Sequence, residues 1–482
     1  MVAGLGRAGT AAAQALAAQH GGDAVRVWDG LDRPFERERA GELARLGIET
    51  LHDADGIAVL DAVPSPRTLV KSPGLSAKTP IVADARRRGL AVIDEAELGW
   101  LLDERPLVAV TGTNGKSTTT SLVSAVLATA GRAPVAAGNT MFGVPYSATP
   151  EQAGDVIVAE LSSFQLEACP SLRPDAAVLT NLTPDHLYRH GSFAEYARCK
   201  RRLLIGDDHV VPVAAVGVDQ PFGRELVAAL RDRGATVVSF GRHPTADRRV
   251  LSVEPVLGGG TVRISEGSGA RTLELRLTGA HNALNAAGAL ALADALAIPS
   301  ETATTALADC QPLPGRFESQ RSADGFDVII DFAHNPDGVE QALSAAAAIT
   351  AARGSGALRV VLSTLALVGR AQAHAVGRAG AAHADQLVLT TQRWTLDDAA
   401  DRLPDGLLEG AREAPRGTVD VELDRAAAIE RAVRAARPGD LVLILDRGDR
   451  GGTLFDPAGH ARPFDDRTEV RALLASSPRA PS

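Results

Sequence analysis

The segment GTNGKST, at residues 112–118, has the residue types of a phosphate-binding loop. The apolar letters before it predict a strand, and those after it predict a helix that begins at Lys116 and ends near Gly131. Gly112 and Gly115 allow backbone N–H groups to face an anion, and the helix N-terminus attracts negative charge. Lys116 adds a full positive charge, and Ser117 or Thr118 offers a hydroxyl to Mg²⁺. An ordinary strand-to-helix turn would explain the glycines but not the lysine and hydroxyls, so we predict a shortened phosphate loop.

Two side chains suited to a metal ion follow apolar runs in the same region. Glu160 ends the run VIVAE, and His186 follows the run AAVLTNLTPD. Ligands bind at the carboxyl ends of strands in open α/β sheets, so we expect both near Mg²⁺ or Mn²⁺ held partly by phosphates. Taken singly, Glu160 is more simply a surface carboxylate and His186 a hydrogen-bonded loop histidine. Their place on successive strands beside a phosphate loop favours the metal role.

The N-terminal residues have the pattern of a nucleotide-binding fold. Residues 1–30 predict a strand, a G-x-G-x-x-G turn, a helix and a second strand that ends at Asp29, placed to reach a ribose. The glycines of the turn are Gly4, Gly6 and Gly9. Taken alone, this pattern is weak evidence for a nucleotide.

Further alternation of strands and helices predicts an α/β protein of three domains. The expected ranges are 1–103, 104–312 and 313–482, with joints at ERP and at QPLPGRFES. The second range contains the phosphate loop on a parallel sheet, with a hairpin at GGGTVRIS and RTLELRL, and the third repeats the pattern of strand, polar turn and helix. The last residues, SSPRAPS, are expected to be disordered.

Composition predicts a globular enzyme with small-molecule substrates. The chain has 482 residues, 45% of them hydrophobic and 23% charged. A net charge of −9 argues against a nucleic-acid partner. Three cysteines without a CxxC motif predict a reducing compartment. The sequence contains neither a long apolar span nor a signal-peptide pattern, so we expect a cytoplasmic protein without membrane contact.

Six motifs, in this order along nearly the whole chain, resemble those of the Mur ligases. They are GTNGKST, ELSSFQLE (160–167), NLTPDH (181–186), the lysine at Lys200, GAHNALNAAGALALAD (279–294) and LPGRFE (313–318). Mur ligases are ATP-dependent amide ligases of peptidoglycan precursor synthesis, related to folylpolyglutamate synthase. ELSSFQLE and the SPG segment at Ser72 most resemble the members that add glutamate to UDP-N-acetylmuramoyl-L-alanine. The resemblance implies a small Rossmann-like domain for UDP, a central ATPase domain and a C-terminal Rossmann-like domain.

The resemblance also implies roles for single residues. Lys116 would bind the ATP phosphates, Ser117 with Glu160 would bind one Mg²⁺, and these would act with His186 and Lys200 in catalysis. His186 would bind a second Mg²⁺ with Lys200, whose family counterpart is carbamylated. The positions that match nucleotide-binding residues are Gly112, Thr113, Asn114, Gly115, Lys116, Ser117, Thr118, Asn282, Arg316 and Asp331. The positions that match substrate-binding residues are Gly4, Gly6, Gly9, Asp29, Ser72, Asn139, Ser162, Gln165 and His334. Arg7 and Ala8 differ from the residues expected in the first glycine turn.

The third domain departs from the pattern of the D-glutamate-adding enzymes. Where those enzymes carry D-S-K-A-T-N, this chain has DFAHNPDG (331–338), and LSTLALVGR (362–370) replaces a G-G-x-x-K segment. A variant branch adds L-glutamate, with an epimerase acting afterwards, so we favour L-glutamate over D-glutamate. Arg370, Arg447 and Arg450 are candidates for holding the glutamate carboxylates, although each could equally be a surface arginine.

The implied reaction transfers a phosphoryl group from ATP to the alanyl carboxylate, and the amine of glutamate then displaces phosphate. Other classes fit less well. A nicotinamide-dependent oxidoreductase would leave the phosphate loop and Lys200 without a purpose, and a folylpolyglutamate synthase would lack the N-terminal nucleotide domain. An inactive regulator should have lost Lys116, Glu160 or Lys200. A related ligase with another acceptor stays open, and we expect a monomer.

Overall fold

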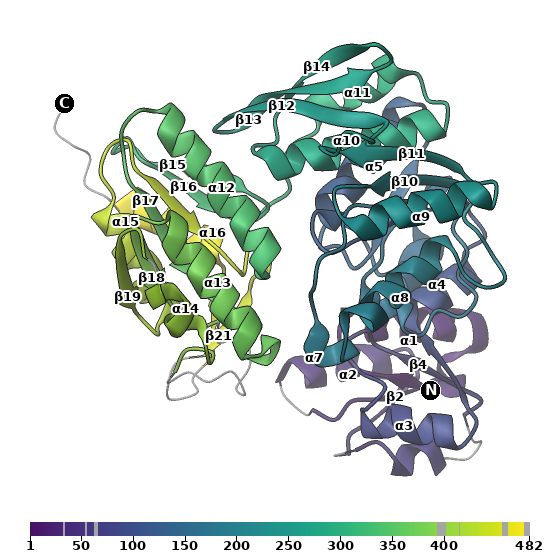
Figure 1. The fold of residues 1–482 in the computed structure, drawn as a ribbon. Helices are drawn as coiled ribbons and strands as arrows, with labels where there is room; N and C mark the ends of the chain where they lie inside the picture. The colour runs from purple at the N-terminus through teal and green to yellow at the C-terminus, as the bar shows by residue number, and fades with distance from the viewer. Residues whose placement is uncertain are drawn as a thin grey trace. The chain divides into compact units, whose positions relative to one another are not determined.

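The computed structural model describes residues 1–31, 34–53, 55–61, 66–392, 402–413, 415–455 and 461–476. Figure 1 shows the helices and strands with the labels used below. The chain divides into two compact units. The first contains residues 1–182, 192–240 and 288–303, and the second contains residues 183–191, 241–287 and 304–482.

The N-terminal part of the first unit is a five-stranded parallel sheet in the order β3-β2-β1-β4-β5. The strands are β1 (Val2–Ala3), β2 (Arg26–Trp28), β3 (Glu49–Leu51), β4 (Thr68–Lys71) and β5 (Ala91–Asp94). The helices are α1 (Arg7–His20), η1 (Gly22–Ala24), α2 (Pro34–Ala44), η2 (Ala58–Asp61), α3 (Pro80–Arg87) and α4 (Glu95–Leu102). Apolar side chains of α1, α2 and α4 pack on one face of the sheet, and those of α3 pack on the other. The glycine turn follows β1, where the strand order reverses and ligands bind in such sheets.

Six parallel strands follow in the order β11-β10-β9-β6-β8-β7. They are β6 (Leu107–Thr111), β7 (Pro134–Gly138), β8 (Val156–Glu160), β9 (Ala176–Leu179), β10 (Val213–Gly217) and β11 (Thr236–Gly241). The helices are α5 (Lys116–Thr129), η3 (Tyr146–Glu151), α6 (Ser163–Leu166), α8 (Phe193–Leu204) and α9 (Pro221–Asp232). Strands β6, β8 and β9 are buried along their whole length, as expected for strands covered on both faces. Their carboxyl ends carry the phosphate loop, Glu160 and the segment before His186.

The second unit begins with the short helix α7 (Leu187–His190) and an antiparallel three-stranded meander. The strands of the meander are β12 (Arg248–Val256), β13 (Gly259–Glu266) and β14 (Gly269–Leu275). The pairing of β13 with β14 confirms the predicted hairpin, and β12 extends it. The helices α10 (Ala280–Ala295) and α11 (Ser300–Asp309) follow in the sequence, and residues 288–303 within this stretch are assigned to the first unit.

The C-terminal part of the second unit is a six-stranded sheet in the order β15-β16-β20-β17-β18-β19, with β15 as its antiparallel edge. The strands are β15 (Glu318–Arg321), β16 (Asp327–Ile330), β17 (Leu358–Leu362), β18 (Gln386–Leu389), β19 (Thr418–Val421) and β20 (Leu441–Ile444). The helices are α12 (Pro336–Ala352), η4 (Ala366–Val368), α13 (Arg370–His383), α14 (Leu407–Glu413), α15 (Arg425–Ala435) and α16 (Asp466–Ser476). A separate pair is formed by β21 (Gly452–Phe455) and β22 (Ala461–Phe464). Helices α12, α13 and α14 cover one face of the sheet, and α15 and α16 cover the other (Figure 1).

The predicted α/β class is confirmed. The helix of the phosphate loop begins at Lys116 as predicted but ends at Thr129, because the chain turns at Ala130 and Gly131. The three main sheets fall within the ranges 1–103, 104–312 and 313–482, while the domain boundaries themselves stay a prediction. Residues 477–482 lie outside the described residues. Among the described helices, none has the length and apolar character needed to cross a membrane.

Candidate active site

The phosphate loop of the first unit connects β6 to α5 in a conformation that requires glycine. Gly112 has φ +148° and Gly115 has φ +81°, values that L side chains rarely adopt. A Cβ atom at Gly112 would lie 1.9 Å from Thr180 Oγ1. The first turn of α5 has neither a side-chain cap nor an acidic residue. The N-terminus of α5 is therefore arranged to receive an anion.

Polar side chains from the segment after β9 and from α8 hold this loop in shape. Asn114 N–H donates to Asn181 Oδ1 over 2.9 Å, and Asn181 Nδ2 donates back to Asn114 O over 3.0 Å. The hydroxyls of Thr113 and Tyr196 are 2.9 Å apart. Neither Asn181 nor Tyr196 was predicted from the sequence to have a role. The signal for Asn181 was its place in the polar turn NLTPDH, whereas Tyr196 had no local signal.

The structure brings together the two groups predicted to share a magnesium ion. Ser117 Oγ donates to Glu160 Oε2 over 2.6 Å, and both residues are buried. Asn139 Nδ2 donates to Glu160 Oε1 over 3.3 Å, and Asn139 N–H donates to Glu160 O over 2.9 Å. A carboxylate beside a hydroxyl at the start of α5 is a donor set that suits Mg²⁺. Thr118 is buried on the same turn of α5.

The two predicted catalytic lysines of the first unit both contact the phosphate loop. Half-buried Lys116 donates from Nζ to Thr113 O over 2.8 Å. Lys200, on α8, is 1% exposed and donates from Nζ to Gly112 O over 2.7 Å. Its Nζ also lies 5.0 Å from the centre of the Tyr196 ring. His186 belongs to the second unit, so its predicted pairing with Lys200 at one ion stays a prediction.

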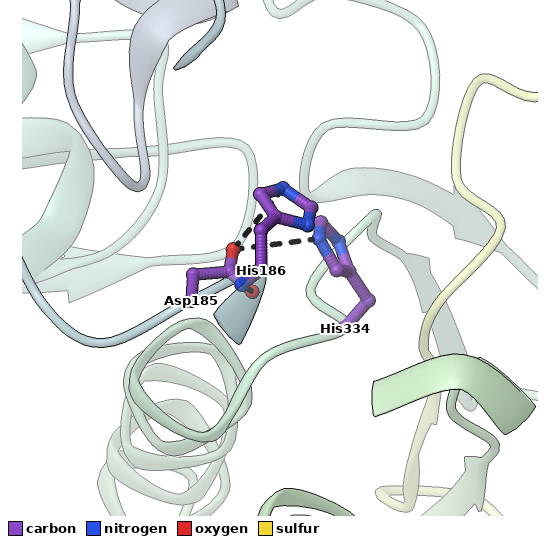
Figure 2. A group of neighbouring side chains, drawn as sticks. All are labelled: Asp185, His186 and His334. Carbon is purple, nitrogen blue, oxygen red and sulfur yellow. Dashed lines mark hydrogen bonds and ion pairs between the residues drawn. The ribbon is translucent and has the colours of Figure 1, made fainter. Parts of the chain in front are cut away.

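In the second unit, His186 lies in a cluster with Asp185 and His334 (Figure 2). One ligand atom from each residue lies within 4.8 Å of the others. His186 Nε2 is 3.6 Å from Asp185 Oδ2, and His334 Nε2 is 4.0 Å from the same oxygen. Two imidazoles and a carboxylate form a donor set that also suits transition metals. No metal role was predicted for Asp185, although the adjacent Asp and His in the sequence were a signal for one. His334 was predicted to bind substrate.

Local structure supports the ligand role of this cluster. His186 has φ +52°, a left-handed conformation that is uncommon outside glycine and often found at functional sites. Burial alone would raise the pKa of Asp185, but the neighbouring His186 and His334, together with hydrogen bonds from His186 N–H and Asn335, hold that pKa below its usual value. Asn335 Nδ2 donates to Asp185 Oδ2 over 3.0 Å. The carboxylate of Asp185 is therefore kept ionised between the two histidines.

The predicted UDP turn is closely packed in the first unit. Gly4 has φ +100°, and a Cβ atom there would lie 2.5 Å from Ser72 Oγ. A Cβ atom at Gly9 would lie 1.9 Å from Gly4 O. Asp29 Oδ2 accepts from the N–H of Leu5 over 2.6 Å. Gly4, Gly9, Asp29 and Ser72 thus lie together, as a single nucleotide turn would require.

Ser162 and Gln165 have a structural explanation beside the predicted substrate role. The Ser162 hydroxyl accepts from Gln165 N–H over 3.3 Å, and Gln165 Oε1 accepts from Ser162 N–H over 2.9 Å. This reciprocal pair is a capping box at the start of α6. The capping box accounts for both residue types without a ligand.

The residues predicted to surround the nucleotide in the second unit are held by local contacts. Asn282 Nδ2 donates to Thr278 O over 2.8 Å. Asp331 accepts from the N–H groups of Phe317 over 2.8 Å and Ala333 over 2.9 Å. The Arg316 guanidinium lies 4.4 Å from the centre of the Phe332 ring and 3.4 Å from Asp449.

The three candidate arginines for glutamate differ in their surroundings. Arg370 is exposed, pairs with Glu409 over 2.6 Å, and lines a cavity of about 150 Å³. Arg447 is fully buried and donates to Gln392 O over 3.0 Å, and burial lowers its pKa to about 10. Arg450 is exposed, with its guanidinium 4.8 Å from the centre of the Phe332 ring. Gln392, Thr364 and Thr391 line the same cavity as Arg370.

Comparisons with known proteins identify the family. Residues 110–293 match the Mur ligase middle domain, and residues 315–447 match the Mur ligase glutamate ligase domain. A UDP-N-acetylmuramoylalanine–D-glutamate ligase of Pelotomaculum thermopropionicum is 35% identical over 352 residues, which cover 71% of this chain and 73% of the relative. The ligase of the same name from Rhizobium etli is 32% identical over 443 residues, which cover 88% of this chain and 87% of the relative.

The chain belongs to the Mur ligase family. It is therefore an ATP-dependent amide ligase of peptidoglycan precursor synthesis. Solved structures of other Mur ligases share the fold of this one. A UDP-N-acetylmuramate–alanine ligase of Thermotoga maritima superposes with a TM-score of 0.63 at 20% identity, covering 98% of this chain and 97% of its own. MurF of Thermotoga maritima in complex with ADP superposes with a TM-score of 0.62 at 15% identity, covering 93% and 94%.

Proposed function

We propose that this Mur ligase joins glutamate to UDP-N-acetylmuramoyl-L-alanine. The observation that carries the proposal is the Ser117–Glu160 contact at the start of α5, beside a glycine loop open to an anion. The choice of acceptor is supported by two relatives of 32–35% identity, which are named as UDP-N-acetylmuramoylalanine–D-glutamate ligases. The glycine turn of Gly4 and Gly9, closed by Asp29, supports a nucleotide-linked substrate.

The side chains of the phosphate loop suit phosphoryl transfer to a carboxylate. Lys116 and the N–H groups of α5 would neutralise charge on the transferring phosphoryl group of ATP. Ser117 and Glu160 would hold one Mg²⁺, which supplies charge neutralisation on the phosphate oxygens. The amine of glutamate then attacks the acyl phosphate, and phosphate leaves.

We propose a second Mg²⁺ held by His186 and by Lys200 as its carbamate. Lys200 Nζ is buried against the phosphate loop. A cationic amine has no free lone pair, and a neutral amine is a poor ligand for Mg²⁺, which prefers oxygen. A carbamate on the same side chain is a carboxylate on a long arm, and oxygen ligands suit Mg²⁺. The position of His186 beside an ionised carboxylate also supports a metal role.

We assign the remaining predicted residues by substrate. Gly4, Gly6, Gly9, Asp29 and Ser72 would bind UDP, and Asn139, Ser162 and Gln165 would bind the muramoyl-alanine part. His334 would also bind substrate. The loop residues Gly112, Thr113, Asn114, Gly115 and Thr118 would bind ATP with Asn282, Arg316 and Asp331. The substrate is a small molecule, and we propose that the enzyme works as a monomer.

We propose L-glutamate as the amino acid that is added, held through Arg370 and Arg450. The segments DFAHNPDG and LSTLALVGR, where the D-glutamate enzymes have other motifs, support this choice. An epimerase would then act on the product. D-glutamate is the second candidate, because the relatives at 32–35% identity carry that isomer in their names.

The proposal is tested by phosphate release from ATP with UDP-N-acetylmuramoyl-L-alanine and either glutamate isomer under identical conditions. Turnover with L-glutamate alone is expected. Turnover with D-glutamate alone would refute the choice of isomer and leave the ligase assignment intact. Release with neither isomer would refute the assigned acceptor.

A further inference from the structure

Arg7 connects two parts of the first unit that are distant in the sequence. It is the first residue of α1, directly after the glycine turn. Its guanidinium donates from Nη1 to Thr140 O over 2.8 Å and from Nη2 to Gly143 O. Both acceptors belong to the loop between β7 and η3. The planar fork of arginine holds two carbonyl oxygens in fixed positions, whereas the ammonium of lysine has rotatable donors on a flexible stem.

The loop that Arg7 holds has little packing of its own at its tip. The two carbonyl groups flank Met141 and Phe142, whose side chains are 55% and 39% exposed. Exposed apolar side chains make few packing contacts, so the backbone at the tip must be held by hydrogen bonds. The guanidinium of Arg7 supplies such bonds on both sides of the tip.

The same loop begins at Asn139, which contacts the proposed metal ligand Glu160. Asn139 donates through its backbone N–H to Glu160 O and through Nδ2 to Glu160 Oε1. The other carboxylate oxygen accepts from Ser117. A continuous set of contacts therefore runs from Arg7 through the loop to the carboxylate of Glu160.

We propose that Arg7 is a positioning residue that holds the loop 139–143 so that Asn139 orients Glu160 for its metal ion. This inference rests on the proposed role of Glu160 as a Mg²⁺ ligand. Residues that orient a metal ligand influence metal affinity although they do not touch the ion. Arg7 thereby joins the nucleotide-sugar turn to the phosphate-transfer centre.

The test measures binding of Mn²⁺ and ADP to the full chain by calorimetry, in the absence of nucleotide sugar. Arg7→Ala is expected to weaken Mn²⁺ binding by about tenfold, in the range seen when partners of metal ligands are removed. Guanidinium ions should restore part of the affinity of Arg7→Ala, because they can occupy the vacated position between the two carbonyls. Arg7→Lys should lie between the wild type and Arg7→Ala.

The matched control is Arg39→Ala, which removes another cation that contacts the same turn, from α2. Arg39 donates to Leu5 O over 2.9 Å and lies 4.2 Å from the Phe35 ring centre. Its loss should leave Mn²⁺ affinity unchanged, because neither contact involves the loop 139–143. Equal losses in the two variants would overturn the proposal, since a general effect on the turn would then explain both.

Glu160→Gln separates failure of this inference from failure of the proposed function. If Glu160→Gln leaves Mn²⁺ affinity unchanged, Glu160 is not a metal ligand, and its role in the proposed function is refuted. If Glu160→Gln weakens Mn²⁺ binding but Arg7→Ala does not, the positioning role is refuted alone. In turnover assays Arg7→Ala should lower kcat at saturating nucleotide sugar, whereas a rise in the KM for nucleotide sugar alone would identify an ordinary substrate contact.

Discussion

Lys116 and Lys200 contact the same loop in opposite environments. Lys116 is half-buried and reaches over the loop to Thr113 O, whereas Lys200 is fully buried against Gly112 O. A charge close to solvent can meet an incoming phosphate without a large desolvation cost, which suits Lys116 to bind ATP. The buried position of Lys200 suits a group that is modified before it acts.

Replacement of Lys116 by alanine should abolish most of the ligase activity. The lost charge would have stabilised the transferring phosphoryl group, so we expect kcat to fall by about 10²–10³-fold. Phosphate release measures the effect, and the unfolding midpoint should stay close to that of the wild type because Lys116 is half-buried. Unchanged turnover would contradict the assignment of the phosphate loop.

Glu95 gives the first unit a predictable dependence of stability on pH. It is the first residue of α4, and its Oε1 accepts from Ser147 N–H over 2.7 Å and from Ser147 Oγ over 2.8 Å. Burial raises its pKa from 4.5 to about 7, although the hydrogen bonds from Ser147 act in the opposite direction. The stability that protonated Glu95 provides is full below its unfolded pKa and is lost as pH rises through about 7.

Glu95→Gln should remove this dependence, because the amide keeps an acceptor for Ser147 and cannot ionise. Each pKa unit is worth about 1.4 kcal/mol, so the variant should be more stable than the wild type at pH of about 8 by up to about 3 kcal/mol. The free energy of unfolding, measured with denaturant at pH of about 5 and about 8, tests this. Identical pH slopes in the two proteins would show that Glu95 is ionised in the folded state at both values.

At the scale of elements, α5 is flanked by two glycines in left-handed conformations that serve different purposes. Gly112 precedes the helix where a Cβ would meet Thr180 Oγ1 at 1.9 Å, and Gly131 follows it with φ +85° and no atom within 4 Å of a Cβ. The first glycine is required by the close approach of the loop to Thr180, directly after β9, and the second by its backbone conformation alone.

Gly112→Ala should therefore weaken nucleotide binding, because the loop must move away from Thr180. We expect a loss of more than about tenfold in ADP affinity, comparable to the loss of one or two charge-assisted hydrogen bonds. Gly131→Ala is the matched control, with a stability cost of about 1 kcal/mol and unchanged ADP affinity. Equal ADP affinity in the wild type and Gly112→Ala would show that the loop does not need its observed shape.

The local elements could be predicted because each has a local cause. The strand before Gly112, the helix at Lys116 and the position of Glu160 at a strand end all follow from apolar periodicity and glycine turns. The contact of Asp185 with His334 could not be predicted in this way, since it depends on how distant segments pack. The bonds of Arg7 to the loop 139–143 were also missed, because an arginine after a glycine turn has no local signal for its partner.

At the scale of the whole molecule, the proposed catalytic residues belong to both compact units. Lys116, Glu160 and Lys200 are in the first unit, and His186 is in the second. Family motifs predicted all four, but the sequence does not say how the chain divides into compact units. The first unit contains the predicted N-terminal domain and much of the predicted central domain. Contacts between the two include Lys71 Nζ, which donates to Phe164 O, and Ser171 N–H, which donates to Glu97 Oε1. Such contacts between side chain and backbone leave no periodic trace in the sequence.

The most direct test of the central claim follows oxygen atoms from the alanyl carboxylate of UDP-N-acetylmuramoyl-L-alanine. The carboxylate is labelled with heavy oxygen, the complete chain is supplied with ATP, Mg²⁺ and glutamate, and the released phosphate is analysed by mass spectrometry. If ATP phosphorylates that carboxylate, one labelled oxygen should appear in phosphate for each amide bond formed. Amide formation accompanied by phosphate without label would contradict the account, as would phosphate release without amide formation.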